Sequence, residues 1–249
     1  MKPLTNKIFR IMQVVILAGG LGTRLRPLTY NVPKPMIEIK GKPFLEYLIL
    51  YLKNQGLKNI LILTSYLSEK IASYFKDGSS LGVLIKYSNE ISPLGTGGAL
   101  KNAERYLNKE FILLNGDTFI PLDYNKLIYY YKNSGRKNII VVNKNKKSRG
   151  NIMIDRNKKV VEYNKKEKKF QYEACGVQIF KKEILRLMPK NKVISVENDI
   201  FPLEIKKTDL IAFETKADFF DLGTFERVKR FRGVINTYFR GINNERKSN

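Results

Sequence analysis

The feature that most constrains this chain is a glycine-rich loop that directly follows a short apolar run. From Val14 to Met36 the sequence reads VVILAGGLGTRLRPLTYNVPKPM. A continuous apolar run that stops at glycines is typical of a buried strand in a parallel sheet. In α/β sheets, ligands bind beyond the carboxyl ends of the strands, where glycines let backbone N–H groups approach a phosphate chain. The stretch therefore predicts an α/β fold with a phosphate-binding loop.

Fixed positive charge accompanies the glycines of this loop. The planar guanidinium of Arg24 can hold a phosphate through two hydrogen bonds, and Lys34 stands between two prolines that restrict its backbone. The loop is not a P-loop, because no Gly-Lys-Ser/Thr follows at the right spacing. It is not the dinucleotide motif G-x-G-x-x-G either, because Leu25 takes the place of the third glycine.

Strand and helix patterns alternate as far as residue 143. Apolar runs predict strands at residues 14–18, 59–65, 83–88, 111–117 and 138–143. Apolar residues at helical spacing, with proline or cap residues before them, predict helices at residues 43–52, 68–75, 97–107 and 123–133. This alternation predicts a doubly wound, mostly parallel α/β sheet with helices on both faces.

The pattern changes after residue 143. Three short strand patterns follow closely, with turn residues but no full helix between them, at residues 150–155, 159–164 and 173–180. They predict a small antiparallel insertion. A helix near residues 182–188, strands at 210–214 and 219–223, and a helix from Thr224 complete the expected elements.

Composition excludes several kinds of catalysis. The 249 residues include no histidine, which excludes imidazole bases, Ser-His triads and zinc bound by histidine. Any metal must then be a hard ion held by carboxylates and substrate oxygens. Cys175 is the only cysteine, so no internal disulfide can form, and we find no targeting or membrane-spanning segment. We therefore expect a protein of the reducing cytoplasm.

The formal net charge of +23 would attract anions such as nucleic acid, phosphorylated metabolites or acidic lipid. Many of the lysines, however, are scattered among asparagines in loop-like stretches such as NKNKKSRG and NKKEKKF. We interpret them mainly as a solvated surface. No stripe of alternating aromatic and basic residues marks a binding face, so nucleic acid is not an expected partner.

The strings LAGGLGTRLRPLT and PKPM resemble the signature of the sugar-phosphate nucleotidyltransferases, also called sugar-nucleotide pyrophosphorylases. KPFLEYLILYLKNQG, PLGTGGAL, FILLNGDT and FFDLGT extend the resemblance in the family's order, over about residues 13–240. Within the family, the combination is most similar to the D-glycero-D-manno-heptose 1-phosphate guanylyltransferases. The resemblance implies one Rossmann-like nucleotidyltransferase domain at 13–240, between a flexible leader at 1–12 and a polar tail at 241–249. Its nucleotide half would span about 13–143 and its sugar half about 144–240.

This resemblance implies a specific reaction. A sugar 1-phosphate oxygen attacks the α-phosphorus of a nucleoside triphosphate, so that pyrophosphate leaves and a sugar nucleotide forms. The nucleophile is already an anion and needs no general base, which agrees with a chain without histidine. We expect guanylyl transfer from GTP to a heptose or hexose 1-phosphate. Uridylyl or thymidylyl transfer to a hexose 1-phosphate, and a nucleotide-binding regulator that has lost turnover, remain as alternatives.

The resemblance also implies roles for particular residues. Arg24 would bind the β- and γ-phosphates and stabilise the departing pyrophosphate, while Lys34 would neutralise the α-phosphate. Asp117 and Asp221 resemble the family's two ligands of Mg²⁺, which is the expected cofactor. The residues expected to bind the nucleotide are Leu17, Ala18, Gly19, Gly20, Gly22, Thr23, Glu90, Gly95 and Thr96.

Glu90 bears on the choice of base. Relatives that use thymidine or uridine triphosphate typically carry a glutamine here. An amide can both donate and accept, as a pyrimidine edge requires, whereas a carboxylate only accepts. Guanine offers two adjacent donors, N1–H and the exocyclic amine, which match a carboxylate. Glu90 therefore favours guanine.

The sugar half departs from the family pattern. Many relatives have a Glu-Glu-Lys-like string where this chain reads YNKK, so the sugar-binding glutamate is missing. Glu162 could replace it only with a shift of register. Lys166 is the best match for the lysine that binds the sugar phosphate, with Lys165 as the alternative. Gly150 and Gly176 also match positions of the sugar pocket. The sequence leaves the sugar and the oligomeric state open.

Overall fold

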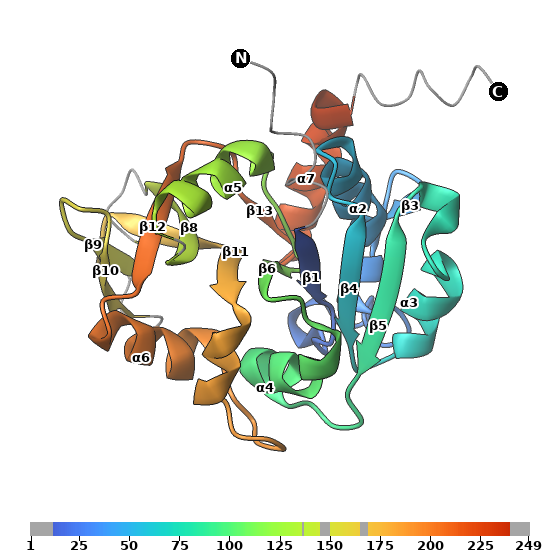
Figure 1. The fold of residues 1–249 in the computed structure, drawn as a ribbon. Coiled ribbons are helices and arrows are strands. Elements are labelled where there is room, and N and C mark those ends of the chain that lie inside the picture. Colours follow the sequence, from blue (N-terminus) through green and yellow to red (C-terminus); the bar gives the residue numbers. More distant parts are fainter. Residues whose placement is uncertain (1–11, 136, 145–149, 165–168, 240–249) are drawn as a thin grey trace, which may run out of the picture.

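The computed structural model describes residues 12–135, 137–144, 150–164 and 169–239, and every structural statement below concerns these residues. Its centre is a mixed sheet of nine strands (Figure 1). The strands are β1 (Gln13–Leu17), β4 (Asn59–Thr64), β5 (Leu84–Asn89), β6 (Glu110–Asn115), β8 (Asn138–Lys144), β9 (Ile152–Ile154), β10 (Val160–Tyr163), β11 (Tyr172–Lys181) and β12 (Leu210–Thr215).

The sheet has a parallel part and an antiparallel part. Strands β6, β1, β4 and β5 lie side by side and all run parallel. β11 pairs antiparallel with both β6 and β8, and β12 runs parallel to β8. β9 and β10 form an antiparallel pair that meets β11 through β9. The mostly parallel sheet and the antiparallel strands after residue 143 confirm the predicted fold class.

Helices cover both faces of the sheet. They are α2 (Phe44–Asn54), α3 (Ser68–Phe75), α4 (Gly95–Asn102), α5 (Tyr124–Asn133), α6 (Phe201–Lys206) and α7 (Phe225–Phe239). Val14 and Ile16 of β1 join one core with side chains of α2, α3, α5 and α7, whereas Val15 joins a second core with side chains of α4 and α6. Successive side chains of a strand point to opposite faces, so one buried strand supplies both cores.

A short ribbon joins segments that are far apart in the sequence. β7 (Thr118–Phe119) pairs antiparallel with β13 (Phe220–Asp221). Phe231 of α7 packs against Phe119 and Phe220, with ring centroids 5.3 and 5.6 Å apart. The aromatic contacts therefore hold residue 221 beside the loop that follows β6. A second ribbon pairs β2 (Glu38–Ile39) with β3 (Lys42–Pro43).

Several predicted elements differ in detail. The helix expected at 97–107 is α4 followed by a 3₁₀ turn, Glu104–Tyr106, and the segment at 182–188 forms 3₁₀ turns, Lys182–Leu187, rather than an α-helix. α6 and the π-helical turn before it, Val196–Ile200, were not predicted, because six residues are too few to show a helical period. Within the described part of the chain, no helix combines the length and hydropathy that crossing a bilayer needs.

Candidate active site

The carboxyl ends of β1, β4 and β6 meet at one edge of the sheet. Leu17, the last residue of β1, pairs with Leu63 of β4 and Asn115 of β6. The Ala18 N–H donates to the Leu63 carbonyl at 2.8 Å, and the Gly116 N–H donates to the Leu17 carbonyl at 2.9 Å. These bonds hold the loops after β1 and β6 together, at the edge where α/β sheets bind ligands.

A cavity of about 600 Å³ opens at this edge, within the range of about 300–1,000 Å³ that is usual for ligand sites. Its walls bring together most of the predicted nucleotide-binding and catalytic residues, namely Leu17, Ala18, Gly19, Gly20, Arg24, Lys34, Glu90, Gly95, Thr96 and Asp117. The walls also contain residues that the sequence did not single out, among them Asn115, Ser195, Glu197 and Asn198.

Close packing explains the glycines of the first loop. A Cβ atom at Gly19 would lie 3.0 Å from the Cβ atom of Ser65 and 3.3 Å from Oε1 of Glu90. Gly22 has φ of +62°, a left-handed conformation that favours glycine, and its carbonyl accepts a hydrogen bond from the Thr29 hydroxyl at 2.8 Å. The loop then turns into a 3₁₀ segment, Thr23–Leu25, which carries Arg24. Gly22 and Thr23 thus shape the loop without lining the cavity.

Lys34 and Asp117 form an ion pair in the wall of the cavity. Nζ of Lys34 lies 2.5 Å from Oδ2 of Asp117. Lys34 opens a 3₁₀ turn, Lys34–Met36, and only 9% of its surface is exposed. A buried charge is costly unless it is paired, so the two residues fix each other. The pair sets a cation and a carboxylate side by side where a phosphate chain would lie.

The backbone at Asp221 lies beside the backbone at Asp117, although the two residues are far apart in the sequence. In the ribbon of β7 and β13, Asp221 pairs with Thr118, and the Leu222 N–H donates to the Asp117 carbonyl at 2.9 Å. The Asp221 carboxylate accepts hydrogen bonds from the Gly223 N–H at 2.8 Å and from Nη1 of Arg227 at 2.5 Å. Asp221 does not line the cavity itself, but the ribbon makes its backbone a neighbour of the segment that carries Asp117.

The carboxylates near the cavity can be compared with the ligands that a metal ion requires. Within the described residues, no group of three or more His, Cys, Asp or Glu side chains could hold a metal. Asp117 and Asp221 could supply two carboxylates, with water and substrate phosphate oxygens completing the coordination. Mg²⁺ is usually held in this way, by one or two carboxylates and substrate phosphates. The residues therefore fit Mg²⁺ and do not fit a metal that needs a full protein cage.

Glu90 lies at another wall of the cavity. Its backbone N–H donates to the Thr64 carbonyl at 3.0 Å, directly after β5, and its Oε2 accepts a hydrogen bond from the Leu94 N–H at 3.2 Å. Burial raises the pKa of the Glu90 carboxyl, and the Leu94 N–H opposes this shift. Glu90 is buried, and a buried carboxylate has few water partners, which increases the effect of a matching donor from a ligand.

Three glycines of PLGTGG allow a distant segment to reach the cavity. A Cβ atom at Gly95 would lie 2.5 Å from the Ile194 carbonyl oxygen. The same carbonyl accepts hydrogen bonds from the N–H groups of Gly97 and Gly98 at 2.8 and 3.3 Å, and the Ile194 N–H donates to the Leu94 carbonyl at 2.8 Å. This contact brings residues 195–198 into the cavity wall. The glycines were the only sequence signal of that approach.

The predicted sugar-phosphate residues are not gathered in this cavity. Gly176 is near it, with φ of +68° and a virtual Cβ 2.7 Å from Nδ2 of Asn115. Gly150 pairs instead with Phe170, in an isolated antiparallel bridge. Lys165 and Lys166 lie outside the described residues.

Comparison with known proteins defines the class. The family described as Nucleotidyl transferase matches residues 13–231. The chain belongs to this family, and the cavity is therefore its candidate active site.

Two relatives of this chain carry the same name, and a solved structure is also similar to it. The chain is 52% identical over 116 residues to a D-glycero-alpha-D-manno-heptose 1-phosphate guanylyltransferase of Campylobacter jejuni, a match that covers 47% of this chain and 52% of that protein. It is 35% identical over 233 residues to the enzyme of the same name from Aneurinibacillus thermoaerophilus, across 91% of this chain and 100% of the relative. The crystal structure of HddC from Yersinia pseudotuberculosis complexed with GMP-PN matches with a TM-score of 0.76 and 37% identity, covering 88% of this chain and 97% of that one.

Proposed function

We propose that this chain transfers a guanylyl group from GTP to a sugar 1-phosphate, with a heptose 1-phosphate as the acceptor. The observation that carries the proposal is that Arg24, Lys34, Asp117 and Glu90 all line one cavity at the carboxyl ends of the strands. The name of the Aneurinibacillus thermoaerophilus relative, which matches across 91% of this chain, supports this base and acceptor, and the GMP-PN in the HddC structure supports the base.

The chemistry is a displacement at phosphorus. An anionic oxygen of the sugar phosphate forms a bond to the α-phosphorus of GTP, the bond between the α-phosphorus and the bridging oxygen breaks, and pyrophosphate leaves with the electron pair. No proton has to move, so the protein acts by orienting the substrates and stabilising charge. In this mechanism the backbone of the glycine loop binds the phosphates, Arg24 stabilises the leaving pyrophosphate and Lys34 neutralises charge at the α-phosphate.

We further propose Mg²⁺ as the metal, held by Asp117 and Asp221. When bound, it would neutralise phosphate charge in the transition state. The ion pair with Lys34 is compatible with this role, since it holds the Asp117 carboxylate in the cavity wall beside the lysine proposed to neutralise the α-phosphate.

Glu90 is the residue proposed to recognise the guanine base. Its carboxylate would accept hydrogen bonds from guanine N1–H and from the exocyclic amine. A uracil or thymine edge would instead set carbonyl oxygens against the carboxylate. The assignment of Lys166, Gly150 and Gly176 to the sugar phosphate, and a cytoplasmic location, stay predictions.

The proposal is tested by following pyrophosphate release from each nucleoside triphosphate with Mg²⁺ and a panel of sugar 1-phosphates. We expect the largest kcat/KM with GTP and D-glycero-α-D-manno-heptose 1-phosphate. Preference for uridine or thymidine triphosphate would contradict guanylyl transfer. Binding of GTP without turnover on any acceptor would instead favour a nucleotide-binding regulator.

A further inference from the structure

One carboxylate of the cavity has no part in the proposed binding of GTP. Glu197 belongs to the π-helical turn Val196–Ile200 and lines the cavity. A carboxylate near the phosphates of a ligand repels them, so it is tolerated where it faces neutral hydrogen-bond donors. An ionised carboxylate only accepts hydrogen bonds, which makes hydroxyl groups its natural partners in a carbohydrate.

Two protein hydroxyls fix one oxygen of this carboxylate. The Thr96 hydroxyl accepts a hydrogen bond from the Val196 N–H at 2.8 Å, and the Ser195 hydroxyl accepts one from the Asn198 N–H at 3.1 Å. Each hydroxyl can therefore use its own proton to donate, and both donate to Oε2 of Glu197, at 3.2 and 3.1 Å. Among the described residues, none donates a hydrogen bond to Oε1.

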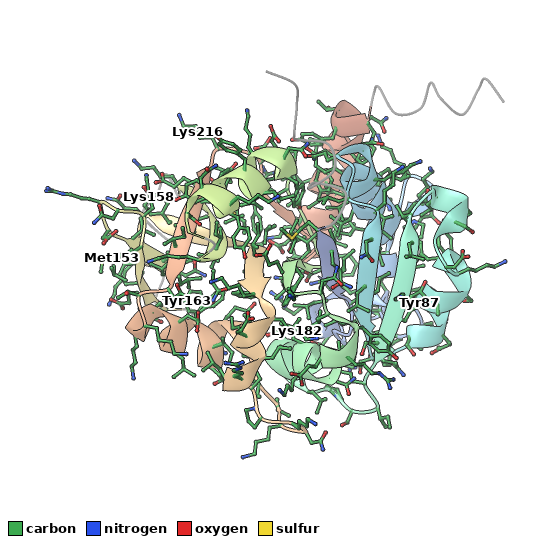
Figure 2. The ribbon with its side chains drawn as sticks, viewed as in Figure 1. Tyr87, Met153, Lys158, Tyr163, Lys182 and Lys216 are labelled. Carbon is green, nitrogen blue, oxygen red and sulfur yellow. The ribbon has the colours of Figure 1, made fainter. Side chains whose placement is uncertain are left out.

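The surroundings of Glu197 point to the acceptor rather than to GTP. Tyr163, which Figure 2 labels, is the last residue of β10. Its ring packs at 90° against that of Phe201 of α6, with ring centroids 5.2 Å apart. Tyr163 packs against the hydrophobic cluster that contains Val196, the residue before Glu197, and burial raises the pKa of its hydroxyl. Tyr163 begins the string YNKK, which contains Lys166. Glu197 thus lies between Thr96 of the nucleotide cavity and the strand that leads to the proposed sugar-phosphate lysine.

We propose that Glu197 accepts hydrogen bonds from hydroxyl groups of the acceptor sugar and so supplies the carboxylate that the string YNKK lacks. Thr96 and Ser195 are positioning residues, because they hold Oε2 and leave Oε1 directed at the sugar. The inference rests on the proposed function, since it requires a sugar 1-phosphate as the acceptor.

The test compares Glu197→Gln and Glu197→Ala with the wild type, using GTP and D-glycero-α-D-manno-heptose 1-phosphate. Glutamine keeps an oxygen for Thr96 and Ser195 but turns an amide nitrogen toward the sugar. We expect the KM for the heptose 1-phosphate to rise about ten- to a hundredfold, the effect of one lost hydrogen bond to a charged group. The KM for GTP should be unchanged. Glu183→Gln, which neutralises an exposed carboxylate outside the cavity, is the matched control and should leave both KM values unchanged.

The outcomes separate this inference from the proposed function. If the wild type turns over the heptose 1-phosphate but both Glu197 variants keep its KM, the inference alone is overturned. A rise in the KM for GTP instead would assign Glu197 to the nucleotide and also overturn it. If the wild type binds GTP in calorimetry but transfers to no sugar 1-phosphate, the proposed function is overturned together with the inference.

Discussion

The expected nucleotide half (residues 13–143) and the expected sugar half (residues 144–240) contribute to the candidate site in different ways. In the nucleotide half, Gly19 and Arg24 follow β1 and Asp117 follows β6, so each side chain comes from a short segment directly after a parallel strand. In the sugar half, Ser195 and Glu197 reach the cavity from a turn that no strand leads into, through hydrogen bonds to Leu94 and the glycines of α4. The first half depends on local sequence, and the second depends on tertiary contacts.

The proposed metal site would join the two halves, and its loss should have the largest effect. Asp117 comes from the nucleotide half and Asp221 from the sugar half, yet the ribbon of β7 and β13 makes them neighbours. We expect Asp117→Asn and Asp221→Asn each to lower kcat at least about a thousandfold, because several kcal/mol of charge stabilisation are lost. Steady-state kinetics over a range of Mg²⁺ concentrations measures this.

Asp218→Asn is the matched control for Asp221, because Asp218 accepts a hydrogen bond from the Tyr238 hydroxyl at 3.0 Å, which asparagine can still accept. This control should keep wild-type turnover, and circular dichroism should find all three variants folded. If only one of the two site variants lost activity at saturating Mg²⁺, the idea of a shared metal site would be wrong.

Arg24 comes from the loop after β1 in the nucleotide half, and we expect its substitution to affect the use of GTP. Lysine keeps the charge but cannot form the paired hydrogen bonds of a guanidinium. We expect Arg24→Lys to lower kcat about a hundredfold, as the loss of one transition-state donor does in other enzymes. The KM for the sugar 1-phosphate should not change. Arg26→Lys, two residues further on and outside the cavity, should behave as the wild type.

Glu90 should have a smaller effect that depends on the base. Glu90→Gln replaces a carboxylate, which only accepts hydrogen bonds, with an amide that also donates. We therefore expect the kcat/KM for GTP to fall about tenfold or more. The difference in kcat/KM between GTP and the uridine and thymidine triphosphates should become smaller. Relative kcat/KM values for the three triphosphates measure this change, with Glu69→Gln as a control on an exposed carboxylate of α3. An equal loss for every triphosphate would remove Glu90 from base recognition.

The contact between α4 and residues 192–194 links the two halves. A substitution in α4 can strain this contact without changing a charged residue. A Cβ atom at Gly98 would lie 2.6 Å from the Cβ atom of Leu94 and 2.7 Å from the Lys192 carbonyl oxygen. We expect Gly98→Ala to lower the free energy of unfolding by about 1–3 kcal/mol through overpacking, and to raise the KM for the sugar more than that for GTP.

Gly233→Ala is the matched control for this strain. Gly233 lies in α7, is exposed, and has no atom within 4 Å of a virtual Cβ. Alanine there should stabilise the helix by about 0.5–1 kcal/mol. Equal effects of the two substitutions in thermal unfolding would mean that the segment at 192–198 is not held through α4.

The contrast between the halves also explains how far the sequence could predict this protein. Arg24, Lys34, Glu90 and Asp117 were predicted and lie in one cavity, because parallel strands deliver their loops to a common edge. Glu197 was missed, because its neighbour Thr96 lies a hundred positions away and a carboxylate in a polar turn carries no pattern of its own. Asp221 was predicted only through the resemblance to the family, since its partner strand has two residues.

The most direct test of the account is a competition in which the protein meets equal concentrations of GTP, ATP, UTP and dTTP with Mg²⁺ and D-glycero-α-D-manno-heptose 1-phosphate. The products are separated and identified by mass spectrometry. The account predicts GDP-heptose as the main product, with pyrophosphate formed in equal amount. A UDP- or dTDP-sugar as the main product, or pyrophosphate without any sugar nucleotide, would contradict it.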